Sequence, residues 1–129
     1  MTQINNDPTV EETTSDALDL AHLLVDTISD KKASDIIILD LREQSALTDY
    51  FLICTAENRR QLRAVANALL EDAKQKANVV AMGREGDSDA GWILLDFGDL
   101  MVHIFSPEQR LYYGLEELWH ESHVVLRMQ

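Results

Sequence analysis

The hydrophobic positions of this chain follow two spacings, and each spacing predicts a different kind of element. Residues 16–32 place apolar side chains three and four positions apart, as an amphipathic helix does. Thr14 or Ser15 can cap this helix. Residues 58–77 repeat the pattern, with an apolar stripe made of Leu62, Val65, Ala66, Leu69, Leu70 and Ala73. We therefore expect two long helices, each with one buried face.

Short apolar runs predict the strands. Residues 35–41 (DIIILDL) and 50–54 (YFLIC) are rich in β-branched and aromatic residues, and we expect both strands to be buried on both faces. Three further strands are expected at residues 79–82, 92–97 and 100–105, with a charged, glycine-containing loop at 83–91. Ser106 and Pro107 then suit the cap and first position of a last helix, which Gly114 interrupts.

The expected order is α-β-β-α-β-β-β-α, a mixed five-stranded sheet with flanking helices in the α/β (α+β) class. Residues 1–13 are polar and acidic without periodicity, and we interpret them as a disordered tail. Residues 120–129 show no clear period and are interpreted as a C-terminal tail. The sequence therefore predicts a single domain at residues 14–119.

The strands at 92–97 and 100–105 predict a hairpin whose two faces differ. The two-residue connection Gly98-Asp99 suits a type II′ turn, which sets the cross-strand pairs. One face is wholly apolar and is expected to pack on the core; it carries Ile93, Leu95, Phe97, Leu100, Val102 and Ile104. The opposite face places Trp92 across from Phe105, Leu94 across from His103, and Asp96 across from Met101.

Two interpretations fit that second face. Large apolar side chains beside an acid and an imidazole are typical of a protein-docking patch with an aromatic anchor. Alternatively, a helix covers the face, and Asp96 bonds to His103 or to the backbone, because a buried polar group needs a partner.

Charge narrows the classes of partner. The chain has 129 residues, 11 basic against 23 acidic, giving a net charge of −12. Such a balance argues against nucleic acid as the main partner and favours basic partners. Cys54 has no second cysteine for a disulfide, which fits a reducing compartment. No basic presequence and no apolar run of ~20 residues is present, so we expect a soluble cytoplasmic protein with no membrane contact.

Several strings resemble one known family. They are DYFLIC at 49–54, GREG at 83–86, GWILLDFGDLMVHIFS at 91–106, and EQRLYYGLEELW at 108–119. In these strings the chain resembles the ribosomal silencing factor RsfS, or Iojap, family, from about Ala17 to Trp119.

The resemblance implies a function and a fold. Such proteins bind the large ribosomal subunit through the ribosomal protein numbered fourteen on its intersubunit face. Their bulk blocks joining of the small subunit and represses translation under nutrient limitation. The family fold is similar to that of nucleotidyltransferases, and homodimers occur within the family. A large-subunit assembly factor is the alternative function on the same surface, and no cofactor is implied.

The resemblance also places the partner-binding residues. Its WxxxDxGDxxxH pattern falls on Trp92, Asp96, Gly98, Asp99 and His103, and its last helix on Arg110, Tyr113, Leu115, Glu116, Leu118 and Trp119. With the hairpin analysis, the expected contact residues for the ribosomal protein are Trp92, Leu94, Asp96, Asp99, Met101, His103, Phe105 and Tyr113. In this set we expect His103 to orient Asp96.

Catalysis and metal binding are weaker hypotheses. A metal-dependent nucleotidyltransferase needs a Gly-Ser pair and converging carboxylates, whereas this chain has no Gly-Ser pair, and Asp87 and Asp89 lie in the expected loop. Cys54 sits in an apolar run and is expected to be an inert core thiol. His120 and His123 have zinc-like spacing without a second ligand pair. We therefore expect no enzyme, no metal and no catalytic residue.

A basic cluster stands out in so acidic a chain. Arg59, Arg60 and Arg63 gather at the start of the second helix, where the helix dipole disfavours positive charge. One interpretation is a solvated face paired with neighbouring acids. The other is a minor contact with ribosomal RNA.

Overall fold

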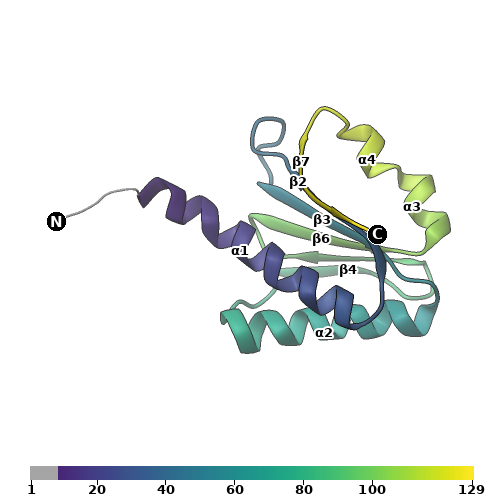
Figure 1. Ribbon diagram of the computed structural model, residues 1–129. Helices are drawn as coiled ribbons and strands as arrows, with labels where there is room; N and C mark the ends of the chain where they lie inside the picture. Colours follow the sequence, from purple (N-terminus) through teal and green to yellow (C-terminus); the bar gives the residue numbers. More distant parts are fainter. Residues whose placement is uncertain (1–8) are drawn as a thin grey trace.

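A six-stranded mixed sheet with helices on both faces forms the molecule (Figure 1). The computed structural model describes residues 9–129, and of residues 9–15 the backbone alone. The helices are α1 (Thr9–Asp30), α2 (Arg59–Ala77), α3 (Pro107–Tyr113) and α4 (Leu115–Leu118). The strands are β2 (Ser34–Asp40), β3 (Tyr50–Thr55), β4 (Gly83–Asp87), β5 (Trp92–Asp96), β6 (Leu100–Phe105) and β7 (His123–Met128).

The strand order across the sheet is β4-β5-β6-β3-β2-β7. β3 and β6 lie side by side in parallel, while β2 pairs antiparallel with both β3 and β7, and β5 pairs antiparallel with both β4 and β6. The strands richest in apolar residues are therefore central, and β4 and β7 form the two edges.

Alternate residues of the central strands enter two separate hydrophobic clusters, as the period of two requires. The larger cluster lies between the sheet and the helices α1 and α2, and takes Ile38 from β2, Leu52 from β3 and Val102 from β6. The smaller cluster lies on the other sheet face, where α4 contributes Leu115. It contains Ile37, Leu39, Leu41, Phe51, Ile53 and Phe105.

Local sequence signals explain where α2 and the hairpin begin and end. The side chain of Asn58 accepts a hydrogen bond from the Gln61 amide and caps α2, which ends at Asn78 in the left-handed conformation. In the hairpin, Gly98 has φ +89°, as the first position of a type II′ turn requires, and the Phe97 amide donates to the Leu100 carbonyl at 2.9 Å. The predicted cross-strand pairs are confirmed.

The sheet has six strands rather than the expected five. The expected strand at residues 79–82 is wrong: Val80 and Met82 are 69% and 75% exposed and follow the end of α2. The strand is β4, which lies in the expected loop and is exposed at every position. Its sequence, GREGD, carries no apolar alternation, so only its pairing with β5 makes it a strand.

Both chain ends also differ from the expectation. Residues 123–128, expected in a tail, form β7 and pair with β2. The first helix begins at Thr9 rather than near residue 16. The remainder of the expected N-terminal tail, residues 1–8, lies outside the described residues.

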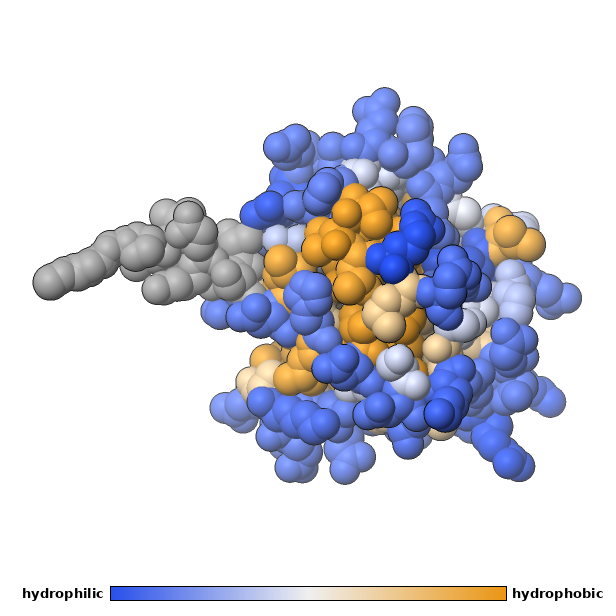
Figure 2. Space-filling view, in the orientation of Figure 1, coloured by the Kyte–Doolittle hydropathy of each residue, from blue (hydrophilic) through white to orange (hydrophobic). Residues whose placement is uncertain are grey.

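The surface has a mixed character. In the view of Figure 2, hydrophobic side chains gather in the middle of the molecule, between α1 and the end of β7, and hydrophilic side chains surround them. Within residues 9–129, no helix combines the length and the apolar composition needed to cross a bilayer.

Candidate functional site

The sheet face that holds the smaller cluster carries most of the predicted site residues. We call it the second face. Trp92, Leu94 and Asp96 of β5 lie beside Met101, His103 and Phe105 of β6, in the predicted register. β3 extends this face with Phe51 and Ile53, which pair with Met101 and His103. Asp99 occupies the hairpin turn at its end, and Tyr113 comes from α3.

A row of aromatic rings crosses the second face. Tyr113 stacks on Phe105 with ring centroids 5.7 Å apart and lies 5.9 Å from Trp92. His103 stacks on Phe105 at 5.8 Å and meets the edge of Phe51 at 4.5 Å. Phe51 in turn lies 6.1 Å from Trp119. The segment that contains α3 and α4 contributes Tyr113, next to Trp92, and Trp119 at the opposite end of the row.

The same segment divides the second face into a covered half and an accessible half. Phe105 is 1% exposed and His103 7% exposed, so both are buried. Trp92, Leu94 and Met101 are half-buried, while Tyr113 is 48% exposed. The interpretation as a face covered by a helix therefore fits the half beneath α3 and α4. The interpretation as a docking patch fits the accessible half. Phe105 and His103 can touch a partner only if α3 and α4 move.

Gly86 of β4 positions the Trp92 ring. Its φ is +80°, and a β-carbon at this position would meet the Trp92 carbonyl oxygen and lie 2.7 Å from Cε3 of the indole. The missing side chain thus lets the indole lie against β4. This contact explains why a glycine stands in an otherwise charged edge strand.

Asp96 and His103 do not form the expected pair. The Asp96 carboxylate accepts a hydrogen bond from the Gly98 amide at 2.8 Å and so supports the hairpin turn. His103 lies opposite Leu94, whereas Asp96 lies opposite Met101. Among the described residues, neither ring nitrogen of His103 has a hydrogen-bond partner. The prediction that His103 orients Asp96 is therefore wrong.

Burial also fixes the protonation state of His103. Removing the imidazolium from water lowers the His103 pKa from 6.5 to about 4. The ring is therefore neutral near pH 7. A buried imidazole without hydrogen-bond partners lowers the free energy of unfolding, because its polar atoms lose their contacts with water. A hydrocarbon ring of similar shape would not carry this penalty.

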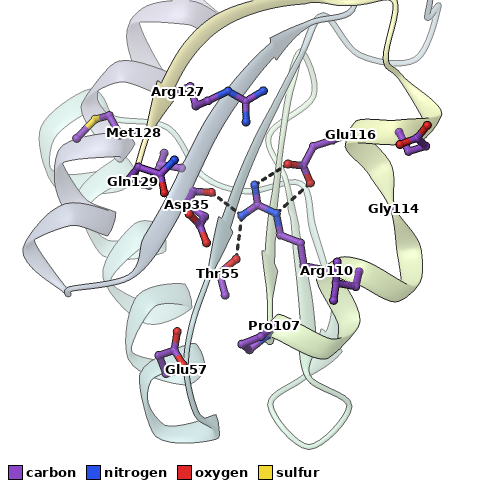
Figure 3. A pocket seen from close by; sticks show the side chains of 13 residues that line it. Asp35, Thr55, Glu57, Pro107, Arg110, Gly114, Glu116, Arg127, Met128 and Gln129 are labelled. Carbon is purple, nitrogen blue, oxygen red and sulfur yellow. Dashed lines mark hydrogen bonds and ion pairs between the residues drawn. The ribbon is translucent and has the colours of Figure 1, made fainter.

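We call the segment that contains α3 and α4, residues 107–119, the cover. Arg110 fixes this cover to the sheet (Figure 3). Its Nε and Nη2 donate to the two carboxylate oxygens of Glu116, at 3.0 and 2.9 Å. Its Nη1 donates to the Thr55 hydroxyl at 2.8 Å and to the carbonyl of Asp35. The Arg110 hydrogen bonds hold the pKa of Glu116 below its ordinary value. One guanidinium thus ties α3, α4, β2 and β3 together; we call this set of bonds the Arg110 clamp.

The cover depends on few contacts. Within the described chain, neither α3 nor α4 contains a buried residue. The cover is attached to the sheet by the Arg110 clamp and by partly buried side chains that pack on the second face, among them Leu115 and Trp119. Because little apolar area is buried, we infer that this segment opens at lower free energy than the core.

The side chains considered as catalytic candidates, those of Asp87, Asp89 and Cys54, take part in structural contacts or are buried. Asp87 accepts a hydrogen bond from the Ala90 amide, and Asp89 pairs with Arg59 at 3.0 Å. Burial raises the pKa of the Cys54 thiol to about 12, so it stays protonated. Among the side chains that the structure describes, those of residues 16–129, no three from histidine, cysteine, aspartate or glutamate are grouped to hold a metal ion.

Two members of the arginine cluster have partners. Arg59 pairs with Asp89, and Arg63 donates to the buried Ser88 hydroxyl at 2.9 Å. Arg60 is exposed and has no ion pair among the described residues. One arginine of the cluster therefore pairs with an acid of the loop that follows β4, and a second bonds to a hydroxyl of that loop.

Comparisons with known proteins agree with one another. A family model described as RsfS, ribosomal silencing factor during starvation, matches residues 14–129. A "Ribosomal silencing factor RsfS" from Halalkalibacterium halodurans is 36% identical over 107 residues, covering 83% of this chain and 91% of its own. One of the same name from Bacillus subtilis is 39% identical over 93 residues, covering 72% and 78%. These names describe ribosome-associated factors rather than enzymes.

The fold is similar to that of solved structures. A crystal structure of a protein from Chromobacterium violaceum superimposes with a TM-score of 0.76 at 34% identity, covering 81% of this chain and 86% of the other.

Replacing His103 by phenylalanine should remove one source of acid sensitivity. The folded-state pKa of His103 lies below the unfolded value of about 6.5, so wild type loses stability as the pH falls from 6.5 toward 4. At pH 5 this loss is on the order of 2 kcal/mol. We expect the free energy of unfolding of His103→Phe relative to wild type to rise by that amount between pH 8 and pH 5. Urea denaturation at both pH values measures it, and a constant difference would contradict it.

Removing the Arg110 clamp should loosen the cover alone. Arg110→Leu leaves Glu116 without its hydrogen bonds, at a cost of roughly 2–3 kcal/mol. We expect amide hydrogen exchange in residues 108–118 to accelerate tenfold or more, with that of β3 unchanged. Arg42→Leu is the matched control, because Arg42 also donates through Nε and Nη2 to one carboxylate, that of Asp40, but is 45% exposed. Equal effects of both variants would contradict the role of the clamp.

Proposed function

Because the chain belongs to the RsfS family of ribosomal silencing factors, we propose that it binds the large ribosomal subunit and sterically blocks joining of the small subunit. We further propose that the contact is the ribosomal protein numbered fourteen, and that docking represses translation under nutrient limitation. The observation that carries the proposal is the accessible half of the second face, where Trp92 is half-buried beside Tyr113.

Shape and chemistry both support docking at this half. The Trp92 ring is seated between Gly86 and Tyr113, so it is already ordered before a partner arrives. A preordered aromatic ring loses little conformational entropy on binding, which suits an anchor residue. Leu94 and Met101, both half-buried on the same face, widen the apolar contact.

An acidic corner adjoins the apolar contact. Asp99 is exposed in the hairpin turn, and its carbonyl accepts hydrogen bonds from the Asp49 and Tyr50 amides, each at 3.0 Å. Burial, and then the neighbouring Asp99 charge, raise the pKa of Asp49. A lysine or arginine of a basic ribosomal protein would relieve this repulsion. Each charge-assisted hydrogen bond so formed would contribute roughly 1.5–3 kcal/mol.

Trp92→Ala should weaken large-subunit binding about thirtyfold or more, because removing a central aromatic anchor costs about 2 kcal/mol or more. Tyr112→Ala is the matched control, since Tyr112 is an aromatic residue of α3 that is 79% exposed. Co-sedimentation with separated subunits measures binding, and light scattering measures subunit joining. Circular dichroism confirms that each variant is folded.

The outcomes separate three possibilities. Loss of binding and of the joining block in Trp92→Ala, but not in Tyr112→Ala, supports the proposal. Equal binding by wild type and folded Trp92→Ala would remove Trp92 from the site. Large-subunit binding by wild type without any effect on joining would instead favour the assembly-factor alternative.

We also propose a minor contact between Arg60 and ribosomal RNA. Arg60 is exposed at the start of α2 and is free of ion pairs among the described residues, so its charge is available to a phosphate. Arg60→Glu should weaken subunit binding and flatten its dependence on salt by about one ion. Glu71→Lys, a charge reversal at an exposed position of α2, is the control. Unchanged binding and salt slope in Arg60→Glu would contradict the contact.

A further inference from the structure

A cleft of about 530 Å³ opens beside α3, and Trp92 is not among the residues that line it (Figure 3). Its walls are α3 and α4 on one side and the ends of β2, β3 and β7 on the other. Asp35, Thr55, Arg110 and Arg127 lie around its interior, with Pro107 and Leu111 on the α3 wall. We propose that this cleft is a second docking site, which takes a basic and partly apolar segment of a partner protein.

The charges of the cleft leave an acidic excess. Four carboxylates line it, those of Asp35, Glu57, Glu116 and Glu117, against two guanidinium groups, those of Arg110 and Arg127. The bidentate contact between Arg110 and Glu116 neutralises one pair. The other three carboxylates, those of Asp35, Glu57 and Glu117, are exposed, form no ion pair among the described residues, and outnumber the guanidinium of Arg127. A cation entering the cleft would therefore gain favourable electrostatic energy.

The walls also offer apolar contact. Leu111 is 85% exposed at the mouth, and Met128 of β7 is 39% exposed across from α3. A single exposed leucine is ordinary, but Leu111, Pro107 and Met128 all line one concave site. A segment with a lysine or arginine next to an aliphatic side chain would match both the acidic excess and the apolar walls of the cleft. An anion or a cation without an apolar part would not match both.

The cleft is separate from the site proposed around Trp92. The Tyr113 ring stacks on Phe105, whereas Leu111 lines the cleft, so these two residues of α3 belong to different surfaces. The Arg110 clamp forms part of the cleft wall and joins both of its sides. The inference does not rest on ribosome binding, because the cleft residues are other than those proposed to contact the subunit.

The experiment uses a defined probe. It is a fluorescein-labelled nine-residue peptide of serines with two leucines and two lysines, and the comparison peptide has glutamates in place of the lysines. Fluorescence anisotropy with the full chain should show saturable binding of the lysine peptide and at least tenfold weaker binding of the glutamate peptide. The amide resonances of residues 107–117 and 127–129 should shift on titration.

Two variants test the cleft itself. Glu57→Gln combined with Glu117→Gln should weaken binding of the lysine peptide fivefold or more, and so should Leu111→Ser. All three positions are exposed, so folding is expected to survive and is checked by circular dichroism. The control is Glu71→Gln combined with Glu85→Gln, which removes two exposed charges from α2 and β4.

The results distinguish a site from general attraction. Weakening in the cleft variants alone, with shifts confined to the cleft, supports the proposal. Equal weakening in the control would show attraction by net charge only and would overturn it. Resonance shifts centred on Trp92 and Met101, or binding unaffected by the cleft variants, would overturn it as well.

Discussion

The position of the segment containing α3 and α4 depends on one guanidinium group. Arg110 reaches across from α3 to Thr55 of β3 and the Asp35 carbonyl of β2, while it grips Glu116 of the following helix. Helices as short as α3 and α4 have little stability of their own in water. Their position is therefore set by polar contacts and a few rings rather than by a buried stripe. Two neighbouring surfaces, the aromatic row and the cleft, both derive their shape from where this arginine holds the chain.

The buried half of the second face carries a cost that the rest of the core avoids. His103 sits among Phe51 and Phe105 with no polar partner within the described residues, although the surrounding cluster is otherwise hydrocarbon. Natural cores rarely leave a buried polar side chain unsatisfied, and exceptions often occur where stability competes with function. Here the exception lies beneath a cover with few anchors, and Phe105 and Tyr113 link it to the Trp92 ring proposed to meet the partner.

Local periodicity was sufficient for the elements that bury apolar residues. The stripe from Leu62 to Ala73 and the alternation around Gly98 predicted α2 and the hairpin register, because side-chain burial repeats with backbone geometry. The hydrophobic pattern did not predict β4 and β7, because edge strands are defined by hydrogen bonds to a neighbouring strand and need no apolar face. The sequence also did not predict the fit of Trp92 against Gly86 or the hydrogen bonds of Arg110. Arg110 and Asp35, for example, are 75 residues apart, and a contact over such a distance in sequence leaves no local pattern.

The two sheet edges differ in a way that limits how copies of the chain could associate. The β4 edge presents the charged residues Arg84, Glu85 and Asp87, and such charged edges resist pairing with another strand. The β7 edge instead presents Val124 and Met128, each 39% exposed, beside exposed His123 and Arg127. Strand addition is therefore more favourable at β7 than at β4. Two molecules joined through β7 would expose only β4 edges, so growth would end at a closed twofold pair and would not continue into a fibre.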